Sequence, residues 1–253
     1  MISFDGVWKN YGETVALRDT SFTVGRGEAT ILTGPSGAGK STLLRILYAA
    51  ERADRGHARI AGYDLTRLRR SAVPQLRRTV GVVFQDFKLL GNRTVRENVA
   101  VALEIRGVGA REVRLRVDAA LAAVGLLPRG DVQAVHLSGG EQQRCAVARA
   151  VVGNPEVVLA DEPTGNLDPE RSRELLHLFE TLRTRGTTIL MATHDPEVVR
   201  FGLAQAWTRI RLISGAIVEL PEEMASGEGD PNDKKGSLVQ LEAAMLRKLL
   251  GAK

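Results

Sequence analysis

The sequence predicts an α/β fold with a mostly parallel β-sheet, because apolar runs alternate with helical patterns along much of the chain. Four short apolar runs bounded by turn residues indicate buried strands; they span residues 29–34, 79–84, 156–161 and 187–193. Several of these runs lack an alternation of apolar and polar residues, as expected for strands covered on both faces. Helical patterns at 40–51 and 172–186 lie between the strands, which is the order of a doubly wound sheet.

The stretch from about residue 89 to 135 breaks this alternation, because two helical patterns follow each other without an intervening strand. In the first pattern Thr94 is a candidate N-cap, and Glu97 three residues later completes a capping box. Gly107 follows the end of this helix, and the second helix ends at Gly125. The sequence therefore predicts an all-helical insert within the α/β core.

The composition is typical of a globular protein in a reducing compartment. The chain has 253 residues, of which 43% are hydrophobic, enough for one large domain or two small ones. The single cysteine, Cys145, excludes an intrachain disulfide and suits a small buried position without a chemical role. We find neither a signal peptide nor an apolar run near the ~18 residues of a membrane span, so we expect a soluble, cytoplasmic chain.

The C-terminal region differs in composition from the rest of the chain. Residues 221–236 are polar and rich in helix-breaking residues, which is typical of a linker. Residues 237–253 place leucines and a methionine on one helical stripe and predict an amphipathic helix, with a disordered tail as the alternative. The partner of this apolar stripe is not evident from the sequence.

Positive charge is concentrated in one stretch of the chain. The net charge of +5 at pH 7 is a mild excess, compatible with nucleic acid or an anionic membrane face as a partner. Five arginines fall within a dozen residues; they are Arg67, Arg69, Arg70, Arg77 and Arg78. A solvated helix face explains them without a partner, and contact with anionic lipid is the alternative. Because no aromatic residues are interleaved for bases to stack on, we expect no nucleic acid.

The first candidate site is the loop GPSGAGKS, residues 34–41, which matches the phosphate-binding pattern GxxxxGK[ST] between a predicted strand and a predicted helix. Glycines allow the backbone amides to wrap the phosphates of a nucleotide, and the helix N-terminus adds a positive dipole. Lys40 would reach the outer phosphates, and Ser41 would be a magnesium ligand. A glycine-rich turn without a ligand is the alternative, which the flanking strand and helix disfavour.

Polar residues near the ends of three further strands extend this site. Asp161 ends one strand, where its carboxylate would hold magnesium, commonly through water, and Glu162 would accept a proton from the attacking water. Gln85 and His194 end two other predicted strands. Because ligands bind at the carboxyl edge of an open α/β sheet, we expect these side chains to share that edge. Each alone is also compatible with an ordinary polar residue at a strand end.

A second candidate anion site is the stretch LSGGEQQR, residues 137–144. Ser138 and Glu141 form a capping box at the start of a helix. A cap does not require Gly139 and Gly140 at the first helical positions, where glycines cost helix stability, so we expect an anion to approach the backbone there. Because the first loop already wraps the phosphates, this second turn is best used on the nucleotide of another molecule.

Together these motifs resemble the nucleotide-binding domain of ATP-binding cassette (ABC) proteins. The two stretches above, VVLADE, NLD at 166–168 and His194 occur in that family's order, within about residues 1–219. The resemblance implies an ABC-type P-loop NTPase with a RecA-like core, an N-terminal antiparallel β subdomain and an inserted α-helical subdomain. It also implies an ATPase that forms a head-to-tail homodimer, with two ATP molecules between the first loop of one subunit and LSGGEQQR of the other.

Domain boundaries and residue roles follow from the same resemblance. The core would comprise residues 1–88 and 154–220, and the helical subdomain with the signature stretch residues 89–153. The expected catalytic residues are Glu162, His194, Gln85 and Lys40, and the expected magnesium ligands are Ser41, Gln85 and Asp161. The expected ATP-binding residues are Tyr11, which would stack on adenine, Gly34, Pro35, Ser36, Gly37, Ala38, Gly39, Lys40, Ser41, Thr42, Gln85, Ser138, Gly139, Gly140, Glu141, Asp168 and His194.

The segment around Gln85, VVFQDFKLLGNRTVRENVA, resembles the cell-division branch of the family. This resemblance implies ATP and Mg²⁺ as cofactors and an integral membrane partner resembling FtsX. It further implies control of extracytoplasmic peptidoglycan hydrolases from the cytoplasmic face of the bacterial plasma membrane, at the division site.

The nearest alternative is the ATPase of a lipoprotein-release or macrolide-efflux complex. An ATPase acting on DNA or ribosomes is disfavoured, because the sequence lacks a long coiled-coil or zinc insertion and a second cassette. A non-hydrolysing nucleotide-binding module is disfavoured because every catalytic position is filled.

Overall fold

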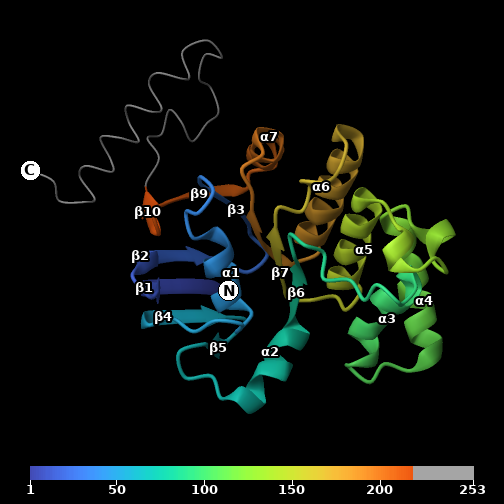
Figure 1. The fold of residues 1–253 in the computed structure, drawn as a ribbon, viewed down its shortest axis with the longest axis horizontal. Coiled ribbons are helices and arrows are strands. Elements are labelled where there is room, and N and C mark those ends of the chain that lie inside the picture. The colour runs from blue at the N-terminus through green and yellow to red at the C-terminus, as the bar shows by residue number, and fades with distance from the viewer. Residues whose placement is uncertain (219–253) are drawn as a thin grey trace, which may run out of the picture. The chain divides into compact units, whose positions relative to one another are not determined.

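The computed structural model describes residues 1–218, which form two β-sheets with helices around them (Figure 1). The first sheet has the strand order β2-β1-β4-β5. Its strands are β1 (Ile2–Tyr11), β2 (Thr14–Val24), β4 (Arg55–Ile60) and β5 (Tyr63–Asp64). The second sheet has the order β10-β9-β3-β8-β7-β6. Its strands are β3 (Ala29–Thr33), β6 (Val80–Val83), β7 (Val157–Asp161), β8 (Thr188–Ala192), β9 (Thr208–Ile213) and β10 (Ala216–Val218).

Helices connect and cover these strands. The α-helices of the described residues are α1 (Lys40–Leu47), α2 (Val73–Thr79), α3 (Val95–Glu104), α4 (Ala110–Ala123), α5 (Gly139–Val151), α6 (Pro169–Thr184) and α7 (Pro196–Ala204). Short 3-10 helices lie at η1 (Arg70–Ala72), η2 (Leu127–Arg129) and η3 (Ala134–His136). Figure 1 shows α3, α4 and α5 gathered on one side of the six-stranded sheet and the four-stranded sheet on the other.

All strand pairs of the four-stranded sheet are antiparallel, which confirms the antiparallel subdomain that the family resemblance implied. β1 and β2 form a hairpin whose turn lies between Tyr11 and Thr14. Phe4 and Phe22 stack across the hairpin with ring centroids 5.0 Å apart. The buried face of β1, which includes Ile2 and Val7, packs toward α1.

The six-stranded sheet is parallel from β9 to β6, and only the edge strand β10 is antiparallel to its neighbour. Its side chains alternate between two cores, as strand geometry requires. On β7, Val157 and Leu159 pack into the core shared with α1 and the antiparallel sheet. Val158 and Ala160 pack into the core shared with α5, α6 and α7. Burial on both faces explains why the four expected strands are continuous apolar runs, and their prediction is confirmed.

The first helix is shorter than the pattern at 40–51 predicted, because α1 ends at Leu47. Ala49 has the left-handed φ of 54°. The Ala49 amide donates to the carbonyl of Ile46 at 3.0 Å, and the Ala50 amide donates to the carbonyl of Arg45 at 2.9 Å. This is the Schellman termination, which glycine usually provides. Because alanine occupies this position, the sequence lacked the glycine that usually marks the end of a helix.

The helical insert is confirmed as α3 and α4, which pack with α5 on a hydrophobic cluster of their own. The fully buried Val99 and Leu103 of α3 and Val117 and Leu121 of α4 are its centre. Cys145 of α5 lies in the same cluster and is buried, as the sequence indicated.

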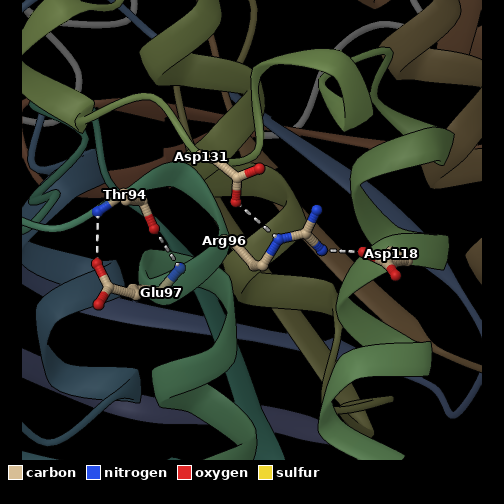
Figure 2. A network of polar contacts seen from close by, with 5 residues as sticks. All are labelled: Thr94, Arg96, Glu97, Asp118 and Asp131. Atoms are coloured by element: carbon tan, nitrogen blue, oxygen red, sulfur yellow. Dashed lines mark hydrogen bonds and ion pairs between the residues drawn. The ribbon is translucent and has the colours of Figure 1, made fainter.

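Polar contacts fix the N-terminus of α3 (Figure 2). The Glu97 amide donates to the Thr94 hydroxyl at 3.1 Å, and the Thr94 amide donates to the Glu97 carboxylate at 2.7 Å, so the expected capping box is confirmed. Arg96 pairs with Asp118 of α4 and, at 3.3 Å, with Asp131. These ion pairs connect α3 to α4 and to the segment that leads into LSGGEQQR.

The linker expected at 221–236 and the helix expected at 237–253 lie outside the described residues. Within residues 1–218, no helix combines the length and the apolar character needed to span a membrane.

Candidate active site

The parallel sheet brings the expected site residues to one edge. Strands β3, β8, β7 and β6 are hydrogen-bonded in that order, so their carboxyl ends lie side by side. Gly34 directly follows β3, Asp161 ends β7, and His194 lies two residues beyond β8. Gln85 lies in an exposed turn two residues beyond the end of β6, the same offset that His194 has from β8.

The loop after β3 has a backbone that requires glycine at two positions. Gly34 has φ 152° and Gly39 has φ 105°. A Cβ at Gly34 would lie 2.1 Å from the carbonyl oxygen of Leu212, and one at Gly39 would lie 2.3 Å from that of Ala16. Close backbone packing on both sides therefore holds the loop open toward solvent, where Pro35, Ser36 and Gly37 are exposed while Ala38 is buried beneath them.

The same loop surrounds a cationic group. Lys40 begins α1, and its ammonium nitrogen donates to the carbonyl oxygens of Gly34 at 2.7 Å and Pro35 at 3.1 Å. The first turn of α1 contains no acidic residue. The ammonium group and the free amides at the helix N-terminus form an anion-binding position.

A cavity of about 360 Å³ adjoins the loop and is lined by all three expected magnesium ligands, Ser41, Gln85 and Asp161. Burial raises the pKa of Asp161; the hydrogen bond from Ser41 opposes this rise, and the neighbouring Glu162 carboxylate adds to it. A buried carboxylate of this kind is stabilised by a cation beside it.

Glu162 is the most constrained side chain of the site. Its φ of 46° is in the left-handed region, and its side chain is only 13% exposed. One carboxylate oxygen accepts a hydrogen bond from the Thr193 hydroxyl at 2.9 Å, and the other lies 2.7 Å from His194 Nδ1. The His194 ring itself is 76% exposed, so one face of this pair is open to a ligand.

Thr193 was not singled out in the sequence, because a threonine at a strand end resembles any β-branched strand residue. It is fully buried, and its hydroxyl also accepts a hydrogen bond from the Asp195 amide at 3.0 Å. The amide of Glu162 donates to the Ala192 carbonyl at 2.9 Å. Backbone and side chain of Glu162 are therefore both fixed by the β8 segment.

The LSGGEQQR stretch opens α5 with Ser138 as N-cap, and its capping box is confirmed. The Ser138 amide donates to the Glu141 carboxylate at 2.9 Å, and the hydrogen bonds from Ser138 lower the pKa of Glu141. One glycine has a reason other than the one inferred from the sequence: a Cβ at Gly140 would lie 3.1 Å from the Asn166 carbonyl oxygen. At Gly139 the nearest atom to such a Cβ is 4.0 Å away, so packing does not require glycine there.

Three further residues that the sequence analysis expected at the site do not line this cavity. Asp168 caps α6 by accepting a hydrogen bond from the Arg171 amide at 2.9 Å, which lowers its pKa. Tyr11 is 39% exposed at the end of β1, with the Lys9 ammonium 5.3 Å from its ring centroid. Thr42 is buried in α1. Among the described residues, no hydrogen bond or ion pair joins the turn at 138–140 to the loop at 34–42.

Helix α5 also holds the backbone that follows Gln85. Phe87 and Lys88 both have left-handed φ values, 58° and 49°. The Arg149 guanidinium, from α5, donates to their carbonyl oxygens at 2.6 Å and 2.7 Å. Burial lowers the pKa of Arg149, which remains a cation dedicated to these carbonyls. Arg149 therefore connects α5, the helix that begins with the LSGGEQQR stretch, to the segment after Gln85. The sequence motifs did not indicate this residue.

Comparison with known proteins defines the class to which this site belongs. A family model described as ABC transporter matches residues 17–165, more than half of the chain. Two solved dimeric cassettes align with 87% of this chain and 97% of their own, each with a TM-score of 0.81. One, 32% identical, is an ATP-binding cassette in a post-hydrolysis state with bound ADP and phosphate; the other, 34% identical, is a bacterial ABC transporter cassette. The chain therefore has the fold of an ABC-type ATPase and belongs to that class of enzymes.

Curated relatives narrow this class further. Proteins named cell division ATP-binding protein FtsE from Streptococcus pneumoniae strain D39 and Escherichia coli K12 are each 50% identical over 200 residues. The alignments cover 79% of this chain and 87% and 90% of the relatives. The FtsE of Mycobacterium tuberculosis is 48% identical over 201 residues. The chain therefore belongs to the FtsE family of cell-division ATP-binding proteins within the ABC superfamily.

Proposed function

We propose that this ATPase is the nucleotide-driven subunit of an FtsEX-like complex and that two copies close head to tail on two ATP molecules. One observation supports the dimer: two helix N-termini suited to anions, at 34–42 and 138–140, both face solvent and share no hydrogen bond among the described residues. A nucleotide held by the first turn leaves the second for the nucleotide of another copy. The dimeric cassettes among the structural relatives support this arrangement.

The residues of the cavity fit a magnesium ion. Magnesium is usually held by one or two carboxylates together with substrate phosphates, and hydroxyl and amide oxygens suit it. Ser41, Gln85 and Asp161 would hold it, and the raised pKa of Asp161 is the mark of a carboxylate that gains from a nearby cation. When bound, the ion would neutralise charge on the transferred phosphoryl group.

The chain's own groups have distinct roles in hydrolysis. Lys40 and the amides of the 34–42 loop bind the phosphates, with Thr42 toward the inner phosphate and Tyr11 against adenine. Glu162, fixed by Thr193, accepts the proton of the attacking water, and His194, 2.7 Å from the Glu162 carboxylate, donates to the terminal phosphate. In the dimer, the turn at 138–140 would contact that phosphate from the other subunit, and Asp168 would lie in the loop that communicates across the interface.

A groove of about 530 Å³ supports a membrane partner. It lies between the segment before Gln85 and helix α3, with apolar Val82, Phe84 and Val101 on its walls, and Ile105 at its edge is 61% exposed. Arg149, which holds the carbonyls after Gln85, lines the same groove. A partner helix seated there would respond when nucleotide binding moves Gln85.

The proposed partner is an integral membrane protein resembling FtsX, through which dimer closure would transmit force to peptidoglycan hydrolases outside the membrane. This assignment is supported by the FtsE relatives, whose names state a cell-division role. We propose that the chain acts at the cytoplasmic face of the plasma membrane, at the division site.

Crosslinking in native membranes tests the proposed role. A tagged Glu162→Gln variant should trap the ATP-bound dimer on its partner, and mass spectrometry identifies the crosslinked proteins. Recovery of an FtsX-like protein with a large extracytoplasmic domain is the expected result. Recovery of a lipoprotein-release or macrolide-efflux permease in its place would overturn the division role and keep the ATPase mechanism.

A further inference from the structure

Residues 45–78 carry a charge that the rest of the chain does not share. This segment contains nine arginines, no lysine and three carboxylates, a balance of +6, whereas the whole chain has a net charge of +5. The remainder of the chain is therefore slightly acidic. The region from the end of α1 through η1 and α2 therefore carries the protein's excess of positive charge.

The carboxylates of this segment leave its arginines uncompensated. Glu51 and Asp54 pair with Lys9, outside the segment, at 3.7 Å and 3.2 Å. Asp64 lies 4.0 Å from Arg59. Among the described residues, no carboxylate lies within ion-pair distance of the other exposed arginines of the segment, which are Arg45, Arg52, Arg55, Arg67, Arg69, Arg70, Arg77 and Arg78.

Several of these guanidinium groups are nevertheless held in place. Arg77 donates to the carbonyl oxygens of Tyr48 and Ala49, both at 3.2 Å. Arg78 donates to the Ile105 carbonyl at 3.1 Å, and Arg52 donates to the Leu68 carbonyl at 3.1 Å. Neutral carbonyls orient these three cations without cancelling their charge.

The cationic surface adjoins the groove described above. Pro74, Arg77 and Arg78 line that groove, whereas Arg70 and Arg52 line a second cavity of about 490 Å³, to which Val73 of α2 also contributes. Figure 1 shows α2 and the segment leading to it at the edge of the molecule remote from α6 and α7. The orientation of this surface rests on the proposed membrane role. If the groove faces the membrane partner, the arginines beside it face the lipids around that partner.

We infer that the exposed arginines Arg67, Arg69 and Arg70, with their neighbours Arg52, Arg55, Arg77 and Arg78, form a surface that binds the anionic headgroups of the membrane's inner leaflet. Arginine suits this task, because its planar guanidinium donates two parallel hydrogen bonds to a phosphate. Each such cation near an anionic surface contributes about fivefold to membrane partitioning. The surface would orient the groove toward the partner before the two proteins engage.

Nucleic acid is the less suitable occupant of this surface. Stacking on single strands needs exposed aromatic rings, and the segment's only aromatic residues, Tyr48 and Tyr63, are both partly buried. The arginines also lie beside an apolar groove, a combination that membrane-facing surfaces share and that phosphate-backbone contacts do not require.

Vesicle co-sedimentation of the full-length protein tests this inference without any partner protein. Phosphatidylcholine vesicles with and without phosphatidylglycerol are compared for the native chain and for the triple variant Arg67→Gln, Arg69→Gln, Arg70→Gln. The native chain should bind only the anionic vesicles, with an affinity that falls as salt is raised. The triple variant should lose binding on the order of a hundredfold while retaining its ATP turnover.

A matched control separates local charge from total charge. The variant Arg111→Gln, Arg114→Gln, Arg173→Gln removes three exposed arginines from α4 and α6 and has the same net charge as the test variant. It should bind anionic vesicles as the native chain does. Equal loss in both variants, unchanged binding in the test variant, or binding of duplex DNA in place of vesicles would each overturn the inference. Because no membrane protein is present, these outcomes are independent of which partner the crosslinking recovers.

Discussion

At the scale of single residues, the geometry around Glu162 separates groups that touch the reacting atoms from groups that position them. His194 is exposed to the ligand side of the site, whereas Thr193 is fully buried behind the carboxylate. Thr193 donates to Glu162 and itself accepts from the Asp195 amide, so its hydroxyl has no freedom to rotate away. We regard it as a positioning residue for the general base.

Substitution of Thr193 by valine should lower kcat roughly tenfold with little change in KM, because a hydrogen bond to a charged group contributes on the order of 1.5 kcal/mol. Steady-state ATP hydrolysis measures both constants. Thr193→Ser retains the hydroxyl and should restore most of the rate. Equal kcat in the valine and serine variants would show that the hydroxyl does not position the base.

Cys145 should be chemically inert in the native protein. Burial raises the pKa of its thiol to about 11, and the thiolate is the reactive form. Because Cys145 is the only cysteine of the chain, labelling with iodoacetamide reports on it alone. We expect labelling at pH 8 to be at least about a hundredfold slower in the folded protein than in denaturant. Comparable rates in the two states would contradict the buried position within the helical cluster.

At the scale of elements, α3 and α5 begin with the same kind of capping box. Comparing the two caps separates an effect on ATP turnover from an effect on folding stability. Thr94 at α3 and Ser138 at α5 both form capping boxes, with Glu97 and Glu141 as the reciprocal partners. The α3 cap lies beside the ion pairs of Arg96 without joining them (Figure 2), whereas Glu141 of the α5 cap pairs with Arg129 at 3.2 Å.

Thr94→Ala and Ser138→Ala should each lower the free energy of unfolding by about 1 kcal/mol, the usual cost of losing an N-cap. Only Ser138→Ala should also lower ATP turnover, since its helix N-terminus is the one proposed to contact phosphate. Urea denaturation and a phosphate-release assay measure the two effects. Equal losses of turnover would indicate that both caps act through stability alone.

The elements of the fold differ in how far the sequence alone could predict them, for physical reasons. The buried strands and the α3 cap were predictable, because two-sided burial and capping boxes leave clear local patterns. The end of α1 was not, because Ala49 takes the left-handed position that glycine usually marks. The packing reason for Gly140 was likewise hidden, since it depends on Asn166, a residue outside the motif. The hydrogen bonds of Thr193 and Arg149 also depend on tertiary contacts.

At the scale of the whole molecule, the sheet collects one set of phosphate-binding groups at its edge while α5 presents a second set elsewhere. Motif order was enough to predict the first set, because parallel strands end at a common edge. The second set, at the N-terminus of α5, is proposed to act on the nucleotide of another copy of the chain. The structure of one protomer therefore cannot show its ligand. The central claim is therefore that each ATP is bound by groups from two chains.

A mixing experiment tests this claim most directly. On the Glu162→Gln background, one chain carries Lys40→Ala and another carries Gly139→Asp. At Gly139 an added Cβ would meet no atom closer than 4.0 Å, and the aspartate would bring negative charge to the phosphate. Differently tagged chains are mixed with radiolabelled ATP, and the pairs are isolated by gel filtration. Binding across two chains predicts that neither variant alone retains ATP, while the mixed pair retains a single molecule in its one intact composite site. Mixed pairs that retain no ATP, or Gly139→Asp pairs that retain a full complement, would contradict it.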